Sequence, residues 1–182
     1  AQIKSLGISG KMGVWIHQFL TGRKQFVYVC SEKSNLTNII SGVPQGTVLG
    51  PILFLILLTS IDANIKNSFV SSFADDTKLV SAVRTIMDAQ MFQCDLDSIY
   101  EWASQTNMTF NGDKFQLLRY GQDELLKQST SYTDCKGNPI AVTANAKDLG
   151  VLMSSDGSYA DHIASVDQKA THMAGWVLRT FY

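Results

Sequence analysis

Two adjacent aspartates, Asp75 and Asp76, are the residues whose type and spacing most clearly suggest chemistry in this sequence. Neighbouring carboxylates repel each other, so keeping both ionised is costly unless a cation neutralises them. Mg²⁺ prefers oxygen ligands, commonly one or two carboxylates with substrate phosphates completing the shell. Two such ions about 3.5–4 Å apart can activate an attacking oxygen and stabilise a leaving oxygen. The pair therefore suggests metal-assisted phosphoryl transfer, although a solvated turn is the commoner role of an isolated Asp-Asp pair.

Strand-like segments flank the two aspartates. Residues 69–73 and 78–83 are short runs with aromatic and β-branched side chains, which places residues 74–77 at the tip of a hairpin. Because successive strand residues point to opposite faces, the two carboxylates are unequal ligands unless the tip turns tightly. We expect one aspartate to dominate and a third carboxylate to come from elsewhere.

A polar, glycine-rich loop, SGVPQGTVLGP (residues 41–51), runs directly into the apolar segment ILFLILL (residues 52–58). Pro44 stiffens the loop, Gln45 offers a donor and an acceptor, and Pro51 suits the first turn of a helix. The free amides of that turn would face the loop. A plain helix-capping loop explains the glycines and Pro51 almost as well, but it does not require Gln45. Three glycines would let the backbone approach a ligand closely: Gly42, Gly46 and Gly50.

A lysine with possible catalytic use, Lys114, lies just after the turn signal Asn111-Gly112. Its ammonium group could reach a phosphate or donate a proton. A solvated lysine on a hairpin is the more common role, so the position alone makes Lys114 only a candidate.

The remaining pattern predicts an α+β protein with short antiparallel hairpins packed on helices. Thr85 and Asp88 have the spacing of a capping box at the start of one helix. A polar, loop-like segment at residues 122–138 is the best candidate for a subdomain boundary. Helices are expected at residues 8–20, 52–58 (buried), 85–103 and 163–177. Strand pairs are expected at 25–30 with 36–40 (turn at 31–35), 69–73 with 78–83, 108–110 with 115–120, and 139–142 with 147–153.

Composition limits the class of protein. The 182 residues are 45% hydrophobic, enough for a core, and the longest apolar run is far shorter than the ~20 residues of a membrane-spanning helix. Cys30, Cys94 and Cys135 lie too far apart for a CxxC site, and no secretory leader is evident, so we expect an intracellular protein. Fifteen Lys and Arg against sixteen Asp and Glu lack the basic excess of a typical nucleic-acid-binding domain. Either the partner is not a polynucleotide or basic parts of the protein lie outside this chain.

Four strings, in this order, resemble the palm of a reverse transcriptase: SGVPQGTVLGPILF, SFADDTKLV, MTFNGDKFQLLRYG and KDLGVLM. The resemblance is closest to non-LTR, LINE-type retrotransposon enzymes of the jockey-like kind and covers nearly the whole chain. It implies a polymerase palm followed by the beginning of a helical thumb. Residues 1–121 would be partial palm, and residues 122–182 would be the end of the palm, the primer-positioning hairpin and the start of the thumb.

The resemblance also implies roles for individual residues. Asp75 would be the principal metal ligand and Asp76 the auxiliary acid. Lys114 would lie near the pyrophosphate leaving group. Nucleotide and template contacts would come from Pro44, Gln45, Gly46 and Phe73, where Phe73 replaces the Tyr of many relatives. The primer end would be positioned by Leu149, Gly150 and Val151.

By the same resemblance, the protein is an RNA-directed DNA polymerase that adds deoxynucleotides to a primer 3′-hydroxyl with Mg²⁺ or Mn²⁺. Its partners would be an RNA template, a DNA primer or target, dNTPs and the rest of the retrotransposon polyprotein. It would act in the nucleus and cytoplasm as a ribonucleoprotein, without a membrane and without secretion.

One departure from the family pattern concerns the third carboxylate. In these enzymes it lies in a D-x-x-x-A-F-D block upstream of the GISG helix, and residues 1–26 contain no Asp or Glu. We therefore expect the fingers and the first part of the palm to be missing and the chain alone to be inactive. The alternative is a non-catalytic, retroelement-derived RNA-binding or interaction domain, which would not need the acids. An RNA-dependent RNA polymerase fits the PQG and LGV strings poorly.

Overall fold

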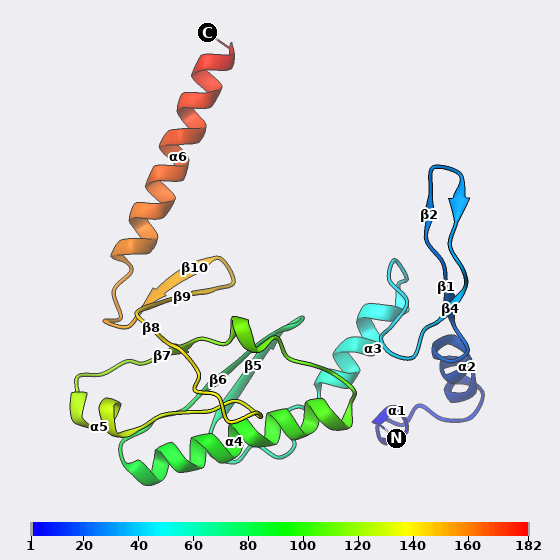
Figure 1. Ribbon diagram of the computed structural model, residues 1–182, viewed down its shortest axis with the longest axis horizontal. Helices are drawn as coiled ribbons and strands as arrows, with labels where there is room; N and C mark the ends of the chain where they lie inside the picture. The colour runs from blue at the N-terminus through cyan, green and yellow to red at the C-terminus, as the bar shows by residue number, and fades with distance from the viewer. Residues whose placement is uncertain (1, 182) are drawn as a thin grey trace. The chain divides into compact units, whose positions relative to one another are not determined.

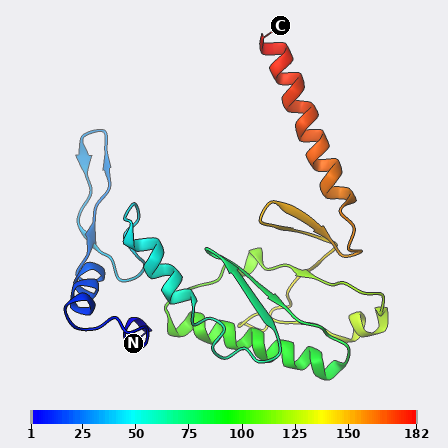
Figure 2. The same cartoon turned by 180° about the vertical axis from the view of Figure 1, so that it is seen from behind.

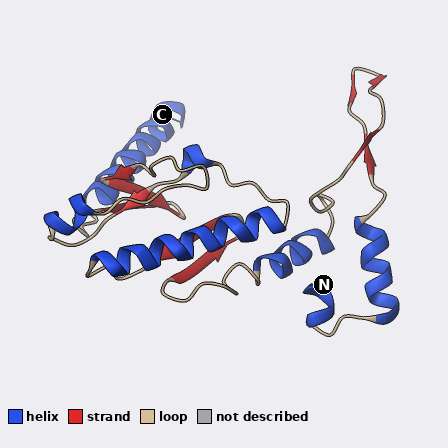
Figure 3. Cartoon of the chain, turned by 60° about the horizontal axis from the view of Figure 1, so that its bottom comes forward, coloured by secondary structure: helices blue, strands red, loops and turns tan. Residues whose placement is uncertain are grey.

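The computed structural model describes residues 2–181 (Figure 1). The chain forms two units, each with its own internal packing. The first contains the residues up to Ser81 together with Ser98–Thr109, and the second contains Ala82–Asp97 and the residues from Phe110 onward. Helices and short strands are mixed throughout (Figure 3), as expected for an α+β chain.

The first unit begins with helices α1 (Gln2–Ser5) and α2 (Gly10–Leu20). The helix predicted at residues 8–20 is therefore present. Ser9 takes the N-cap position with an extended backbone, but its side chain makes no capping hydrogen bond. The apolar face of α2 is covered only in part, because Ile16 is buried whereas Trp15 is 53% exposed.

A two-stranded hairpin follows α2. Its turn lies at Cys30 and Ser31, whose φ angles are +48° and +69°, and not at residues 31–35 as the sequence suggested. Two-residue hairpin turns with positive φ at both positions match the twist of the flanking strands, which explains this tighter connection. The hairpin consists of antiparallel pairs between β1 (Lys24–Gln25) and β4 (Thr37–Asn38) and between β2 (Tyr28–Val29) and β3 (Glu32–Lys33).

The apolar segment forms helix α3 (Leu49–Leu58). Leu53 and Leu58 are buried, but Ile52 is 50% and Leu55 is 54% exposed. The prediction of a buried helix is thus correct for one side only. Helix α1 lies against α3, where the Gln2 side-chain amide donates to the Leu57 carbonyl at 3.1 Å, and covers only part of the helix surface.

The long helix α4 (Ile86–Gln105) starts with the capping box predicted from the sequence. The Asp88 backbone N–H donates to Thr85 Oγ1 at 3.2 Å, and the Thr85 N–H donates to Asp88 Oδ2 at 2.9 Å. The Arg84 N–H also donates to Asp88 Oδ2, at 2.9 Å. These bonds satisfy amides that a helix start otherwise leaves without partners.

The sequence spaces Phe92, Leu96, Ile99 and Ala103 at the helical period, and this face of α4 packs inward in the structure. Within the first unit, the Trp102 indole N–H donates to Ser60 Oγ at 2.8 Å and so ties the end of α4 to the turn after α3. In the second unit, Phe92 meets the Tyr132 ring edge-on, with ring centroids 4.9 Å apart. The buried residues of this face recur at helical spacing: Ala89, Leu96, Ile99, Trp102 and Ala103.

Tyr132 is a buried aromatic residue of the second unit, with 5% of its surface exposed. The Arg119 guanidinium lies 5.4 Å from its ring centroid. Burial raises the pKa of the Tyr132 hydroxyl, and the positive charge of Arg119 acts in the opposite direction. Gln93 holds the adjacent backbone, because its amide both donates to the Thr133 carbonyl and accepts from the Thr133 N–H.

The strand pairing of the second unit differs from the expectation. Strand β7 (Leu117–Leu118) pairs in parallel with β8 (Val142–Thr143), so residues 139–142 are not the partner of residues 147–153. Instead β9 (Asn145–Asp148) and β10 (Val151–Ser154) form a tight hairpin with each other. Local pairing across a two-residue turn leaves the preceding segment free to pair at long range.

The polar segment at residues 122–138 contains a short helix, α5 (Glu124–Ser129), where a loop was expected. Asp123 caps this helix by accepting from the Leu126 N–H at 3.0 Å. An Asp at the cap followed by Glu in the first turn is the usual signal for a helix start. The polar composition of residues 122–138 led us to expect a loop in spite of this signal.

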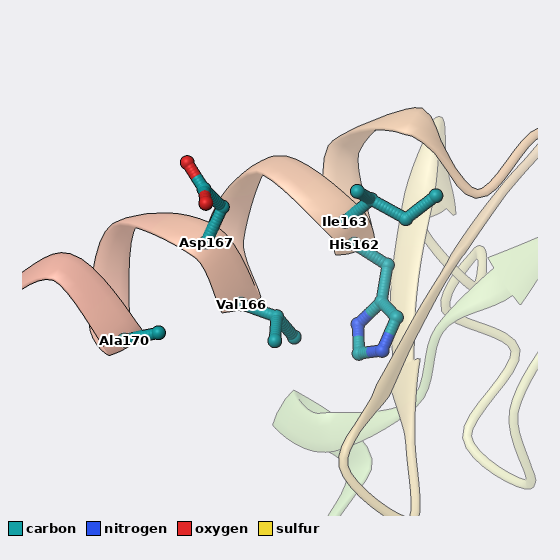
Figure 4. A pocket seen from close by; sticks show the side chains of 5 residues that line it. All are labelled: His162, Ile163, Val166, Asp167 and Ala170. Atoms are coloured by element: carbon teal, nitrogen blue, oxygen red, sulfur yellow. The ribbon is translucent and has the colours of Figure 1, made fainter.

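Helix α6 (Ala160–Phe181) ends the described chain and lies against β10 at its beginning. Leu152 donates its backbone N–H to His162 Nδ1 at 3.3 Å. A shallow hollow of about 380 Å³ runs along this first part of the helix and includes Ile163 and Val166 (Figure 4). The helix predicted at residues 163–177 is confirmed, while its apolar face remains largely exposed. No helix within residues 2–181 is both long and apolar enough to cross a membrane.

The capping box predicts how α4 responds to substitution and pH. Thr85→Ala should lower the free energy of unfolding by about 1 kcal/mol, because it leaves an amide of the first turn without a partner. Backbone donation from Arg84, and then the Thr85 hydroxyl, hold the pKa of Asp88 below its ordinary value of 3.8. A carboxyl with a lowered pKa stabilises the fold above that ordinary value and loses this contribution as pH falls toward the lowered pKa.

Urea denaturation between pH 3 and pH 6, followed by circular dichroism, checks both effects. Asp88→Asn should lower stability at the upper end of this range and flatten the loss of stability toward the acid end. Asp167→Asn, at an exposed aspartate within α6, is the matched control and should leave the profile unchanged. An Asp88→Asn profile parallel to that of the unaltered chain would contradict the capping role.

Candidate active site

The two aspartates lie on the hairpin formed by β5 (Phe69–Phe73) and β6 (Asp76–Val80). Phe73 pairs with Asp76, so the turn consists of Ala74 and Asp75 alone and not of residues 74–77. Ala74 has φ of +53°, in the left-handed region that two-residue hairpin turns use. Ser72 and Thr77 reinforce the end of the ladder through a hydroxyl contact of 3.1 Å. The tip therefore turns in two residues, more tightly than the four-residue tip that the sequence suggested.

The register gives the two acids different backbone settings. Asp75 is a turn residue, whereas Asp76 is the first residue of a strand. Both are exposed, and neither carboxylate forms a hydrogen bond or ion pair with the described part of the chain. Phe73, beside them, is 67% exposed. Two free carboxylates on a rigid turn are donors of the kind that a hard divalent cation binds.

A complete set of metal ligands does not form here from the described residues. Within residues 2–181, no group of three or more His, Cys, Asp or Glu side chains is placed to hold a metal ion. The donors present thus fit part of a divalent-metal site. The third carboxylate expected from the sequence argument is not supplied by the described chain.

The end of the glycine-rich loop is built by Thr47 and Gly50. Thr47 Oγ1 donates to the Pro44 carbonyl at 2.7 Å and accepts from the Gly50 N–H at 3.1 Å. Gly50 is buried, and a Cβ at that position would lie 2.7 Å from the Pro44 carbonyl oxygen. The loop therefore folds back onto the first turn of α3, where Pro51 fits as predicted.

Gly50 consequently has a different role from the one expected. It makes room for the chain's own loop and not for a ligand. Gly46, by contrast, has φ of +74°, and no atom lies within 4 Å of the point where a Cβ would be. Gln45 beside it is exposed. The Gln45 side chain makes no hydrogen bond with the described residues, so its amide is free to bind a ligand.

Two residues that hold this loop were not singled out from the sequence. Thr47 could have been found, because a Thr three residues before a helical N–H is a common cap. Arg23 carried no such signal. Its guanidinium donates to the carbonyls of Ser41 and Gly42 at the start of the loop.

The β5–β6 hairpin and helix α3 line the same hollow. A hollow of about 280 Å³ lies between the last turn of α3, the turn that follows it, and the hairpin residues Val70, Ser72 and Ala74. In Figure 2 the same helix and hairpin are seen from behind. Helix α3 thus supports the hairpin near one end and the Gln45 loop at the other.

The remaining candidate residues belong to the second unit. Lys114 ends a short 3₁₀ helix, Gly112–Lys114, and is exposed. Leu149 and Gly150, with φ of +46° and +92°, are the two turn residues between β9 and β10. Val151 is the first residue of β10 and pairs with Asp148. The family resemblance implied a hairpin at LGV, and a hairpin is present with Leu149 and Gly150 in its turn, whereas the residue pattern alone had placed these residues inside a strand.

Paired carboxylates on a tight hairpin, beside a helix that carries a glutamine-bearing loop, define a candidate phosphoryl-transfer site. The family model described as reverse transcriptase (RNA-dependent DNA polymerase) matches residues 1–168, and the chain belongs to this family. The resemblance drawn from the sequence is thereby confirmed.

Similar proteins come from mobile elements of flies. The RNA-directed DNA polymerase from mobile element jockey of Drosophila melanogaster is 26% identical over 161 residues, or 84% of this chain and 17% of the relative. Its counterpart from Drosophila funebris is 28% identical over 178 residues, or 90% of this chain and 18% of the relative. The probable RNA-directed DNA polymerase from transposon X-element of Drosophila melanogaster is 27% identical over 156 residues, covering 83% of this chain and 17% of the relative. The chain spans less than a fifth of these relatives.

The packing at the loop predicts that Gly50→Ala destabilises the chain by about 1–3 kcal/mol, because the new methyl forces the Pro44 carbonyl and Thr47 to move. Gly175→Ala is the matched control, since it lies within α6 with nothing within 4 Å of the added methyl. The control should be neutral or stabilising by up to about 1 kcal/mol. Urea denaturation of the two variants measures the difference, and equal midpoints would contradict the close packing.

Proposed function

We propose that this chain contributes part of the nucleotidyl-transfer centre of a non-LTR retrotransposon reverse transcriptase. The enzyme copies RNA by adding deoxynucleotides to a primer 3′-hydroxyl. The observation that carries the proposal is the tight hairpin that presents Asp75 and Asp76 as free carboxylates, in a chain that belongs to the reverse transcriptase family. In-line transfer depends mostly on positioning and charge neutralisation, which rigid turns can supply.

Each candidate residue then has a role. Asp75, in the turn, is the principal ligand for a divalent ion, and Asp76, one residue into the strand, is the auxiliary acid. When bound, the ion, Mg²⁺ or Mn²⁺, would neutralise phosphate charge and make the primer 3′-hydroxyl easier to deprotonate. The exposed amide of Gln45, with Pro44 and Gly46, contacts the incoming nucleotide and template base. Phe73, which pairs with Asp76 across the hairpin, belongs to the same set of contacts.

The second unit supplies complementary roles. Lys114, exposed at the end of its 3₁₀ helix, neutralises or protonates the pyrophosphate leaving group. The turn of Leu149, Gly150 and Val151 positions the primer end. In this proposal residues 1–121 are palm, and residues 122–182 complete the palm and begin the thumb.

The whole enzyme, of which this chain is one part, uses an RNA template, a DNA primer at its target and dNTPs. The named relatives are RNA-directed DNA polymerases from mobile elements, which supports this choice of substrates. We propose that it works together with the rest of the retrotransposon polyprotein, as a ribonucleoprotein in the nucleus and cytoplasm.

The isolated 182-residue chain should not extend a primer, because its described residues provide only two neighbouring acids and no third ligand. Primer extension on an RNA template with Mg²⁺ and with Mn²⁺ measures this. A polymerase of established activity serves as the positive control for the assay. Metal-dependent extension by the purified chain would contradict the expectation.

In the full-length polymerase that contains this chain, Asp75→Asn should reduce extension at least about 100-fold, since it weakens binding of the divalent ion that would neutralise the charge of the transferred phosphate. Asp76→Asn should have a smaller effect. Asp167→Asn, an exposed acid on α6, is the charge-matched control and should retain activity. Full activity of Asp75→Asn would contradict the proposal, and absent extension with retained RNA binding would favour a non-catalytic RNA-binding domain.

A further inference from the structure

Arg23 joins two parts of the first unit through its guanidinium group. It lies between α2 and β1 and is half-buried. Its Nε donates to the Leu20 carbonyl at 2.8 Å, and its Nη2 donates to the carbonyls of Ser41, at 3.2 Å, and Gly42. The Arg23 carbonyl also accepts from the Ile39 N–H at 2.9 Å. One residue therefore links the end of α2 to the start of the Gln45 loop.

The partners of Arg23 indicate that it organises backbone. Among the described residues, each side-chain hydrogen bond of Arg23 goes to a main-chain carbonyl and none to a carboxylate. The Leu20 carbonyl is one of the last of its helix and lacks an intrahelical partner, and the negative end of the helix dipole favours a cation there. A planar guanidinium with donors in a fixed fork can bridge carbonyls of separate segments, which a lysine ammonium does poorly.

The Gln45 loop is consequently held at both of its ends. Arg23 fixes its start at Ser41 and Gly42, and Thr47 fixes its end against Gly50. Between these two anchors lies Gln45, exposed and with its amide free of hydrogen bonds to the described residues. The direction in which that amide points therefore depends on both anchors.

We propose that Arg23 is a positioning residue for nucleotide binding. By holding the start of the loop, it sets the orientation of Gln45 and so determines the affinity for the incoming deoxynucleotide. This inference rests on the proposed polymerase function and adds to it a residue that does not itself touch the substrate.

Amide hydrogen exchange in the 182-residue chain tests the anchor directly. Arg23→Ala and Arg23→Lys should both speed exchange of the Ile39 and Gly50 amides, which donate hydrogen bonds on either side of the loop, by about tenfold or more, the change expected when a charge-assisted hydrogen bond is lost. Lys24→Ala, which removes the neighbouring exposed cation, is the matched control and should leave these amides unchanged. Unchanged exchange in Arg23→Ala would overturn the anchor.

Steady-state kinetics of the full-length polymerase test the positioning role. Arg23→Ala should raise the KM for dNTP by about tenfold while kcat changes by less than about twofold, because the substitution weakens nucleotide binding and leaves the chemical step unaltered. Arg23→Lys should not restore the KM. An unaltered KM in Arg23→Ala, or full rescue by Arg23→Lys, would overturn the proposal, since rescue would mean that the charge alone matters.

The same kinetics separate the two proposals. If the unaltered enzyme is active and Asp75→Asn is not, an unchanged KM in Arg23→Ala rejects the positioning role only. If the unaltered enzyme makes no product, or Asp75→Asn is fully active, the proposed function fails and the nucleotide-binding role of Arg23 fails with it. The exchange result then still decides whether Arg23 anchors the loop.

Discussion

The close contact between the Pro44 carbonyl and Gly50 is the constraint on which the candidate site depends. Because Gly50 has no side chain, the loop can fold onto the first turn of α3, and Thr47 closes the contact with two hydrogen bonds. Helix α3 then continues from this loop to the hollow beside the β5–β6 hairpin. A single apolar helix thus supports both the loop that would meet the nucleotide and the hairpin that would hold the metal.

Tight turns produce much of the remaining geometry. Three hairpins within residues 2–181 turn in two residues: Cys30-Ser31, Ala74-Asp75 and Leu149-Gly150. In each, the first turn residue has a positive φ although it is not glycine. Such residues resist the left-handed region, so the surrounding ladder must hold them there. For Asp75 this means a carboxylate whose backbone has little freedom, which suits a group that must meet a metal ion in one orientation.

Local signals in the sequence predicted the site hairpin and the four longer helices well, but not the short helices α1 and α5. The Thr85–Asp88 capping box and the inner face of α4 follow from side-chain spacing alone, and both are confirmed. The turn positions were misjudged because Cys-Ser and Ala-Asp are not the Asn-Gly type of signal on which such predictions rely. The parallel pairing of Leu117 with Val142 joins segments far apart in sequence, so no local pattern indicates it. Arg23 escaped notice because main-chain carbonyls are available everywhere, and a sequence does not show which of them an arginine will reach.

The two glycines on either side of Thr47 are required for opposite reasons. Gly46 has ample space around it but a left-handed backbone conformation. A replacement there is limited by the φ angle, which most L-residues adopt only with strain. Asn or Asp, which tolerate that conformation best among chiral residues, are the natural replacements there. Gly50 has an ordinary backbone but no free volume, so its constraint is one of size and any side chain violates it. The same short loop can therefore drift in sequence at one glycine while the other stays fixed.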